Sequence, residues 1–382
     1  MSNADGFCLQ SLQLDVRRST FDVFWLSTEL VQLIRSEIRE RGPVPFAWFM
    51  QQALYHPEHG YYASGRAAIG RRGDYFTNVS VGPIFGQLLA AQFAEIWERL
   101  GCPGDFVIVE QGAHHGDFAR DVLQCAREWF PKFFAALRYR IIEPFPLLQD
   151  RQSATLHDYC GKVEWAKTPA PFIGVHFSNE LLDALPVNLR GKRVGLAHDE
   201  LILVDAPDDP DAKTNQSALV WIDDMAVNLQ RGFVIVIDYG HARSQFRESL
   251  QVRAQHRHLD SPFEQIGHAD ITMHVNWTDI AERAEVNGLC IAGFTDQHRF
   301  LTGILSAYLE LRRRDLLDSI GLTEQVDGRG KSEQKIAREL QTLLHPEMLG
   351  RAFQVLGLSK DVDLAQPLSG FKFAPDPRAA LE

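Results

Sequence analysis

The sequence predicts an α/β fold of the doubly wound class, in which helices cover both faces of a mostly parallel sheet. Two observations support this prediction. Short, entirely apolar segments alternate with stretches of helical periodicity between residues 106 and 237, and apolar runs without polar alternation are typical of strands buried on both faces. Polar residues or glycines directly follow several of these segments, as they do in parallel sheets that carry ligands at the strand ends.

The N-terminal part is expected to contain two helices joined by a structured loop. The first covers Ser27–Arg41, with Ser27 as a suitable cap, and the second covers Ile84–Leu100. Between them, Phe49–Gly86 is rich in glycine and aromatic residues and too irregular to be one element. The apolar residues expected to share one face of the first helix are Leu30, Leu33, Ile34 and Ile38.

Five apolar segments in the middle of the chain are expected to be strands. The first is followed by a segment in which Phe118, Val122, Cys125 and Trp129 share a helical face, and the second by a helix that reaches about Tyr159. The five predicted strands are Phe106–Val109, Tyr139–Ile142, Val163–Ala166, Phe172–Phe177 and Phe233–Ile237.

The remaining elements complete the predicted fold. Between Pro186 and Val204 the pattern changes to a two-residue alternation with turn residues, which predicts an antiparallel meander inserted into the main sheet or added to it. A helix over Thr278–Glu285, a strand over Leu289–Ala292 and a helix beyond Asp296 are expected to follow.

Composition narrows the class of protein. The 382 residues carry a formal net charge of −11, which argues against binding to nucleic acid or to an anionic membrane surface. No segment approaches the 18 or so apolar residues that a membrane span needs. The five cysteines are scattered and odd in number, and Asp5 and Asp15 interrupt the start of the chain. These features predict a cytoplasmic protein without a disulfide framework, and none of them indicates an oligomeric state.

The ends of the predicted strands carry most of the candidate chemistry. Polar residues or glycines follow the strands at Glu110–Gly116, Glu143–Pro144, Asn179–Asp183 and Asp238–His241, where an open parallel sheet binds its ligands. Glu143 could accept hydrogen bonds from the two hydroxyls of a ribose, or it could be an exposed acid at a helix start.

The loop after the first strand is suited to a nucleotide-like ligand. Gly112 and Gly116 allow the backbone to approach a ligand closely. Because the loop is not GxGxxG and lacks a Walker lysine, it disfavours a nicotinamide dinucleotide or ATP. The adjacent His114 and His115 do not predict a metal, since neighbouring residues in a turn point apart and no metal-site spacing accompanies them.

Several motifs in a fixed order resemble the MidA-like class I S-adenosylmethionine-dependent methyltransferases. The resemblance covers most of the chain, from about Pro45 to about Phe353, and implies the Rossmann-like class I methyltransferase fold. The family includes a mitochondrial protein arginine methyltransferase that acts on a respiratory complex I subunit. The motifs that carry the resemblance are HPEHGYY, GRRGDYFT, VEQGAHHGDFARDVL, NELLDALPV, IDYGH, DITMHV and GFTDQHRFL.

The resemblance implies S-adenosylmethionine as cofactor and a protein arginine side chain as acceptor. It also implies a division into residues 1–100, which cover the cofactor, a core at 101–306 with the meander inserted at about 187–205, and C-terminal helices with a closing strand at 307–382. The implied cofactor-binding residues are Gly73, Asp74, Thr77, Glu110, Gly112, Ala113, His114, Gly116 and Glu143, and those at the reacting end are Asn179, Glu180 and Asp183.

Two acids at the reacting end are candidates for holding a guanidinium. Glu180 and Asp183 are three residues apart and would share a face if the segment were a helical turn, so that both carboxylates could hold an arginine for in-line methyl transfer. They could instead cap a helix start after Asn179. Asp238, Tyr239 and His241 form a second candidate set for holding the substrate. Alternatively, backbone groups satisfy the carboxylate of Asp238, which then only shapes the loop.

The chain departs from the family pattern at three places. Ala113 and His114 replace the glycine–proline–glycine character of the cofactor loop, and Asn78–Val79 and Gly82 replace a serine–proline pair and a serine. Binding is expected to survive, because a residue other than glycine is tolerated where φ stays negative. Two functions therefore stay open: an active methyltransferase, and a non-catalytic assembly or cofactor-binding module with the same fold.

Overall fold

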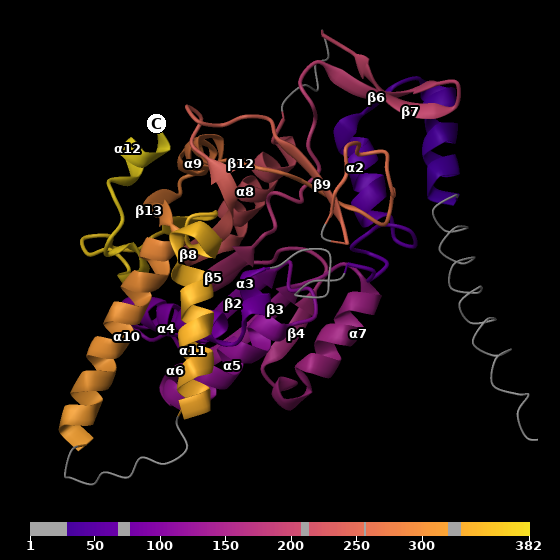
Figure 1. Ribbon diagram of the computed structural model, residues 1–382. Coiled ribbons are helices and arrows are strands. Elements are labelled where there is room, and N and C mark those ends of the chain that lie inside the picture. The colour runs from indigo at the N-terminus through magenta and orange to yellow at the C-terminus, as the bar shows by residue number, and fades with distance from the viewer. Residues whose placement is uncertain (1–28, 68–76, 208–213, 256, 320–329) are drawn as a thin grey trace, which may run out of the picture. The chain divides into compact units, whose positions relative to one another are not determined.

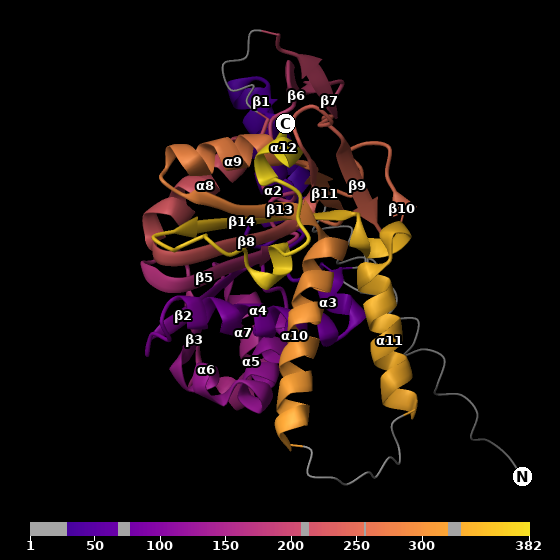
Figure 2. The same cartoon turned by 90° about the vertical axis from the view of Figure 1, so that its left-hand side faces the viewer.

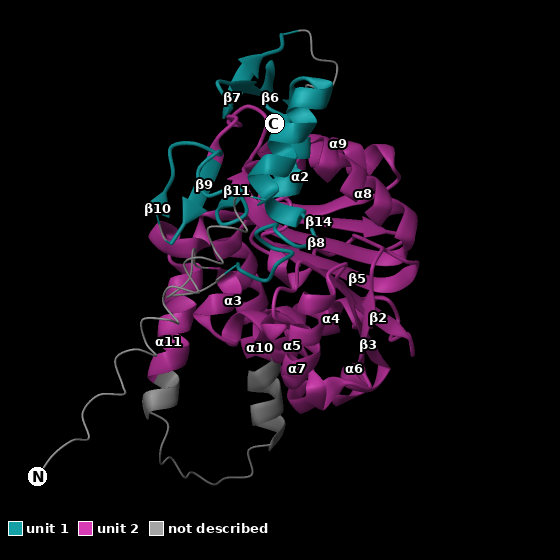
Figure 3. Cartoon of the chain, turned by 90° about the vertical axis from the view of Figure 1, so that its right-hand side faces the viewer, with its two compact units in different colours: residues 1–68, 186–214, 251–271 teal, residues 69–185, 215–250, 272–382 magenta. Residues whose placement is uncertain are grey.

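The computed structural model describes residues 29–67, 77–207, 214–255, 257–319 and 330–382. The chain divides into two compact units, each built from separated segments (Figure 3). Unit 1 contains residues 1–68, 186–214 and 251–271, and unit 2 contains residues 69–185, 215–250 and 272–382. The division into residues 1–100, 101–306 and 307–382 stays a prediction.

Unit 2 is built on a mostly parallel sheet, which confirms the predicted α/β fold (Figure 1). Its described strands follow the order β13-β14-β8-β5-β2-β3-β4, and β12 pairs with β8 beside this path. All pairings from β8 to β4 are parallel, whereas β14 runs antiparallel to both β8 and β13. The strands are β2 (Phe106–Gln111), β3 (Leu137–Ile142), β4 (Val163–Ala166), β5 (Phe172–Asn179), β8 (Leu229–His241), β12 (Val275–Asn276), β13 (Cys290–Asp296) and β14 (Phe353–Lys360).

The order of the strands places the candidate site. From β2 the chain continues to β3 and β4 on one side, and then returns to β5 on the other side of β2. The strand order therefore reverses between β2 and β5, which is where open α/β sheets bind ligands at the carboxyl ends of their strands.

Helices cover both faces of this sheet, as Figure 2 shows. Alternate residues of β2 belong to two separate cores: Phe106 and Ile108 pack with α4 (Ile84–Arg99) and α5 (Asp117–Trp129). Val107 and Val109 belong to the core with α8 (Gln216–Asn228) and α9 (Trp277–Val286) on the other face. Burial on both faces explains why the strand has no polar alternation.

Shorter helices and turns complete unit 2. Trp129 was expected on the buried face of α5, but it is the last residue of that helix and is 43% exposed. The other elements are α3 (Asn78–Val81), α6 (Pro131–Ala136), α7 (Pro146–Thr155), η1 (His157–Tyr159), α10 (Gln297–Ser319), α11 (Gly330–Leu344), η2 (Pro346–Gly350), η3 (Ser369–Phe371) and α12 (Pro377–Leu381).

Unit 1 combines helices with two small sheets, in which the pairs β1–β6, β6–β7 and β9–β10 are antiparallel. Residues 29–41 are helical, with Leu30, Ile34 and Ile38 buried, whereas Leu33 is 41% exposed and was wrongly placed on the apolar face. The predicted meander forms a sheet with β1, outside the main sheet. The elements are β1 (Val44–Pro45), α2 (Phe46–Tyr55), β6 (Lys192–Ala197) and β7 (Glu200–Asp205), with β9 (Leu250–Ala254), β10 (Arg257–His258) and β11 (Asp270–Met273) in the second sheet.

No helix among the described residues has both the length and the apolar character needed to cross a bilayer.

A buried histidine in β5 makes the stability of unit 2 sensitive to acid. His176 has no exposed surface, and neither ring nitrogen has a hydrogen-bond partner within the described part of the chain. Its ring meets the edge of Trp221 at a centroid distance of 5.3 Å. Burial lowers the pKa of His176 to about 3, so the folded protein holds this imidazole neutral.

We expect His176→Leu to reduce the loss of stability in acid. The pKa of His176 is lower in the folded state than the usual 6.5, so the unfolded state binds more protons and the wild type loses stability as pH falls below about 6.5. At pH 5 this loss is about 2 kcal/mol. Chemical denaturation at pH 7.5 and pH 5 measures it. The exposed His258→Gln variant serves as control, and an equal acid dependence in wild type and His176→Leu would contradict the assignment.

Candidate cofactor-binding and active site

The loop after β2 turns through three left-handed backbone positions. Gly112 has φ +84°, His114 has φ +46° and Gly116 has φ +81°, and the backbone NH of Gly116 donates to the carbonyl of Ala113 at 2.7 Å. The expectation that φ stays negative at the replaced position is therefore wrong. Histidine is one of the few residues other than glycine that adopt this conformation with some frequency, so the chain keeps the turn without the glycine.

Two histidine rings occupy the tip of this loop. His114 and His115 stack with their ring centroids 3.7 Å apart, so the expectation that these two side chains point apart is wrong. Nε2 of His115 lies 3.2 Å from Nη1 of Arg151. Burial and the positive charge of Arg151 lower the pKa of His115. The unprotonated ring nitrogen of a neutral imidazole can accept a hydrogen bond from the guanidinium of Arg151. Among the described residues, no three histidine, cysteine or acidic side chains gather as a metal site would require.

Glu110 lies at the carboxyl end of β2 and faces the core. Its side chain is 3% exposed, and Oε2 accepts a hydrogen bond from the hydroxyl of Tyr139 in β3 at 2.7 Å. Burial raises the pKa of Glu110 to about 7, although the bond from Tyr139 opposes this shift. Glu110 thus connects the carboxyl end of β2 to Tyr139 within β3.

Glu143 follows β3 and is buried, so the alternative of an exposed acid at a helix start is wrong. Its side chain is 5% exposed. Oε1 accepts the backbone NH of Phe145 at 3.1 Å, and Oε2 accepts Nε2 of Gln152 at 3.0 Å. Burial raises the pKa of Glu143, and these two donors lower it. A carboxylate has about four acceptor positions, so capacity remains for two ligand hydroxyls.

The segment after β5 is not helical. Glu180 has φ +54°, and residues 180–185 form bends and turns. The proposed helical face for Glu180 and Asp183 is therefore wrong, and so is their role in capping a helix start. Instead, Oε1 of Glu180 accepts Nδ2 of Asn179 at 2.6 Å and the backbone NH of Asn78 at 3.4 Å. Asp183 is buried, whereas Asn179 and Glu180 are half-buried.

A chain of side-chain amides supports this strand end. Nδ2 of Asn78 donates to Oδ1 of Asn179 at 2.8 Å, and Nε2 of Gln297 donates to Oδ1 of Asn78 at 2.9 Å. Asn78 and Gln297 have no exposed surface. The network therefore connects the first residue of α3 and the first residue of α10 to the reacting end.

Asp238 shapes the loop after β5. Its Oδ2 accepts the backbone NH groups of Leu181, Leu182 and Asp183 at 3.0, 2.7 and 3.3 Å, and Oδ1 accepts the NH of Tyr239 at 2.8 Å. This confirms the interpretation that backbone groups satisfy Asp238. Burial raises the pKa of Asp238 to about 7, and the four NH donors oppose this shift. The rings of Tyr239 and His274 stack nearby at 6.2 Å.

The segment before α4 is described only in part. Gly73 and Asp74 lie outside the described residues. Thr77 is buried and caps α3, because its hydroxyl accepts the backbone NH of Ser80 at 3.2 Å. Gly82 has φ +149°, and a Cβ there would lie 2.3 Å from Cδ of the buried Glu339. This departure from the family pattern is explained by the packing of α11 against the loop.

Sequence reasoning missed Gln152, Tyr139 and Gln297, which hold these carboxylates and amides. Gln152 stands in a segment that looks like a polar surface helix, PLLQDRQSAT, and yet it has no exposed surface. Asn78 had a signal, because it departs from the family pattern.

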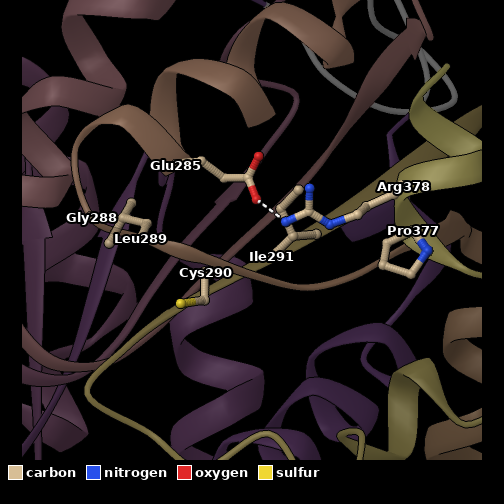
Figure 4. A pocket seen from close by; sticks show the side chains of 7 residues that line it. All are labelled: Glu285, Gly288, Leu289, Cys290, Ile291, Pro377 and Arg378. Carbon is tan, nitrogen blue, oxygen red and sulfur yellow. Dashed lines mark hydrogen bonds and ion pairs between the residues drawn. The ribbon is translucent and has the colours of Figure 1, made fainter.

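A pocket of about 330 Å³ lies at the other edge of the sheet. The pocket lies at the start of β13. Because β8 and β13 both run antiparallel to β14, they are parallel to each other. The pocket is therefore at the end of the sheet opposite the carboxyl ends of the parallel strands. Figure 4 shows Glu285 and Arg378 directed toward each other. Nη2 of Arg378 donates to Oε1 of Glu285 at 2.6 Å. It is lined by Glu285, Gly288, Leu289, Cys290, Ile291, Pro377 and Arg378, and we assign it no part in the candidate site.

The residues at the switch point suit an adenosyl cofactor. Gly112 is exposed, and a Cβ built on it would approach nothing closer than Cδ1 of Leu181 at 3.5 Å. The left-handed loop therefore leaves backbone open to a ligand, and Glu143 offers acceptors beside it. For every candidate residue, contact with the cofactor stays a prediction.

Comparisons with known proteins agree with this site. A family model described as "Putative S-adenosyl-L-methionine-dependent methyltransferase" matches residues 88–199 and 200–295, more than half of the chain. The Drosophila melanogaster protein arginine methyltransferase NDUFAF7 homolog, mitochondrial, is 26% identical over 90% of this chain and 88% of its own. The human protein arginine methyltransferase NDUFAF7, mitochondrial, is 23% identical over 87% and 83%.

A solved structure shares the fold over nearly the whole chain. A superfamily member from Burkholderia thailandensis, bound to S-adenosyl-homocysteine, is 26% identical with a TM-score of 0.79, covering 94% of this chain and 98% of its own. The resemblance to the MidA-like family and the prediction of S-adenosylmethionine as cofactor are confirmed.

The expectation of a cytoplasmic location is wrong, because the Drosophila and human relatives are mitochondrial proteins. No disulfide joins the described cysteines, which are Cys102, Cys125, Cys160 and Cys290.

We expect Asp238→Asn to loosen the loop at residues 181–183. An asparagine keeps the volume but loses the charge that binds four NH groups, which should lower the free energy of unfolding by about 2 kcal/mol. Hydrogen exchange should show faster amide exchange at Leu181, Leu182 and Asp183. The exposed Asp224→Asn variant is the control, and unchanged protection of these three amides would refute the role of Asp238.

Proposed function

We propose a methyl-transfer activity for this chain, which belongs to the family of S-adenosylmethionine-dependent methyltransferases. The chain transfers the methyl group of its cofactor to arginine side chains of a protein substrate. The observation that carries the choice of substrate is that relatives covering 87–90% of the chain are named protein arginine methyltransferases.

We propose that the loop from Gly112 to Gly116 and the carboxylate of Glu143 hold the cofactor. S-adenosylmethionine supplies an activated methyl group on a sulfonium when it is bound. The left-handed glycines would present backbone groups to it, and the two acceptor positions left on Glu143 would take the ribose hydroxyls. Ala113, Glu110, Thr77, Gly73 and Asp74 remain candidates for further contacts.

The acidic end of β5 is the proposed place for the arginine. Methyl transfer is an in-line displacement, so positioning of the acceptor nitrogen contributes most of the protein's help. Glu180 is half-buried and held by Asn179 and Asn78, and carboxylates bind guanidinium through paired hydrogen bonds. Asp183 adds a second buried acid in the same turn. Because Glu180 is half-buried whereas Asp183 is buried, Glu180 is the stronger candidate for direct contact with the arginine.

One observation favours a non-catalytic module as the second candidate. His114 occupies a left-handed position in the cofactor loop, where its ring adds bulk that a glycine would not have. A protein that bound the cofactor without transferring methyl groups would tolerate this bulk.

Two measurements separate these functions. We expect calorimetry to detect binding of S-adenosylmethionine and S-adenosylhomocysteine, and radiolabelled cofactor to label arginine-containing peptides but not matched peptides with lysine in place of arginine. Binding without labelling of any protein or peptide acceptor would support the non-catalytic module. Absence of binding at millimolar cofactor would refute the methyltransferase activity and leave only an assembly module that does not bind the cofactor.

Glu143→Ala should weaken cofactor binding while the fold stays intact. The variant loses the carboxylate that is proposed to accept the ribose hydroxyls, and a bond to a charged acceptor corresponds to a factor of about 10 to 100 in affinity. Calorimetry measures the affinity, and circular dichroism checks the fold. Glu128→Ala, at an exposed position of α5, is the control. Equal affinity in wild type and Glu143→Ala would remove Glu143 from the site.

A further inference from the structure

We propose that Gln152 is a positioning residue that locks the carboxylate of Glu143 and the cofactor loop into one preorganised unit. The inference rests on the proposed role of Glu143 in holding the cofactor. It adds a residue that touches neither the cofactor nor the substrate in this scheme, and that acts through two groups that do.

Gln152 makes hydrogen bonds from three directions. It lies in α7 and has no exposed surface. Its Nε2 donates to Oε2 of Glu143 and to the carbonyl oxygen of His114, both at 3.0 Å. Its Oε1 accepts Nε1 of Trp165 in β4 at 2.9 Å. One side chain therefore connects β4, the residue after β3 and the loop after β2.

The chemistry of these partners leaves one orientation for the amide. The indole of Trp165 can only donate, whereas the ionised carboxylate of Glu143 and the carbonyl of His114 can only accept. A flipped amide would place its NH₂ group against the indole donor and its oxygen against two acceptors, with no bond satisfied. Trp165 therefore fixes the direction in which Gln152 donates.

Both groups that Gln152 holds need a donor from the protein. The carboxylate of Glu143 is buried, and its other oxygen accepts the backbone NH of Phe145, so the bond from Gln152 sets the plane of the carboxyl group. His114 is held in a left-handed conformation, which is unfavourable for a residue other than glycine. Anchoring its carbonyl stabilises this conformation.

The backbone of α7 packs directly on the same loop. A Cβ built on Gly116 would lie 3.5 Å from Cα of Gln152 and 3.2 Å from Cδ1 of Leu156. This packing blocks a closer approach of α7, and the hydrogen bonds of Gln152 oppose its moving away, so the distance between Glu143 and the loop is set before a ligand arrives. Preorganisation of this kind contributes to affinity because less ordering is needed upon binding.

The first test compares cofactor affinity in four proteins. We expect Gln152→Leu to weaken binding of S-adenosylhomocysteine by about 10- to 100-fold, because a bond to a charged acceptor is lost. Trp165→Phe should weaken binding less, since the amide keeps its partners but loses the group that orients it. Gln149→Leu is the matched control on the same helix, because among the described residues the amide of Gln149 donates to the backbone carbonyl of Glu143 and not to its carboxylate.

The second test is a pH profile, which a purely structural role would not move. Binding of ribose hydroxyls needs Glu143 ionised, so affinity falls as pH falls through its pKa. Loss of the donor Gln152 raises that pKa further, since this donor lowers it in the wild type. The fall in affinity of Gln152→Leu should therefore begin at a higher pH. His114, His115, Asp150 and Arg151 are present in both proteins and cancel in the comparison.

The outcomes separate this inference from the proposed function. If wild type binds the cofactor and Glu143→Ala weakens binding, but Gln152→Leu matches wild type in affinity and pH profile, Gln152 has no positioning role and the proposed function stands. If wild type does not bind, both are overturned. Should Gln152→Leu fail to fold, Gln152→Glu decides: its added negative charge beside Glu143 should weaken binding most at neutral pH, and unchanged binding would overturn the inference.

Discussion

Burial of carboxylates at the ends of neighbouring strands is the constraint on which the candidate site depends. Glu110, Glu143 and Asp238 each have 5% or less of their surface exposed, and a buried carboxylate is costly unless the protein supplies donors. The donors come from other elements: the hydroxyl of Tyr139, the amide of Gln152 and the backbone of residues 181–183. Glu143 and Asp238 therefore help to fix loops that the strands alone would leave free, and Glu110 ties β2 to β3.

Left-handed backbone is concentrated in the same region. Gly112, His114 and Gly116 in one loop and Glu180 in the next have positive φ, and strained conformations persist where the surroundings over-determine them. For His114 the surroundings are the stacked ring of His115 and the bond from Gln152. Strain at Glu180 is matched by its bonds to Asn179 and Asn78. These loops are held in conformations that their own sequences would rarely adopt.

Distant parts of the chain converge on the two loops. Asn78 comes from α3, Gln297 from α10 and Glu339 from α11, yet all lie next to the loop segments of unit 2. Two of the three places where the chain departs from its family, Asn78 and Gly82, are where these contacts occur. The amide of Asn78 bridges Asn179 and Gln297, and the missing side chain at Gly82 leaves room for the carboxyl group of Glu339. The departures are therefore matched by partners in this chain.

The sequence by itself determined the fold class, the central strands, α4 and the positions of the strand-end acids, because apolar runs and helical periodicity report burial of a local segment. It also carried the motifs that identified the family and its cofactor. Only the tertiary structure decided that β14 runs antiparallel between β8 and β13, that Glu180 is not helical, that His114 is left-handed and that Glu143 is buried against Gln152. These features depend on partners between 9 and more than 100 residues away in the sequence. Local patterns contain no information about such partners, so a polar-looking segment such as α7 gave no sign that its glutamine lies in the core.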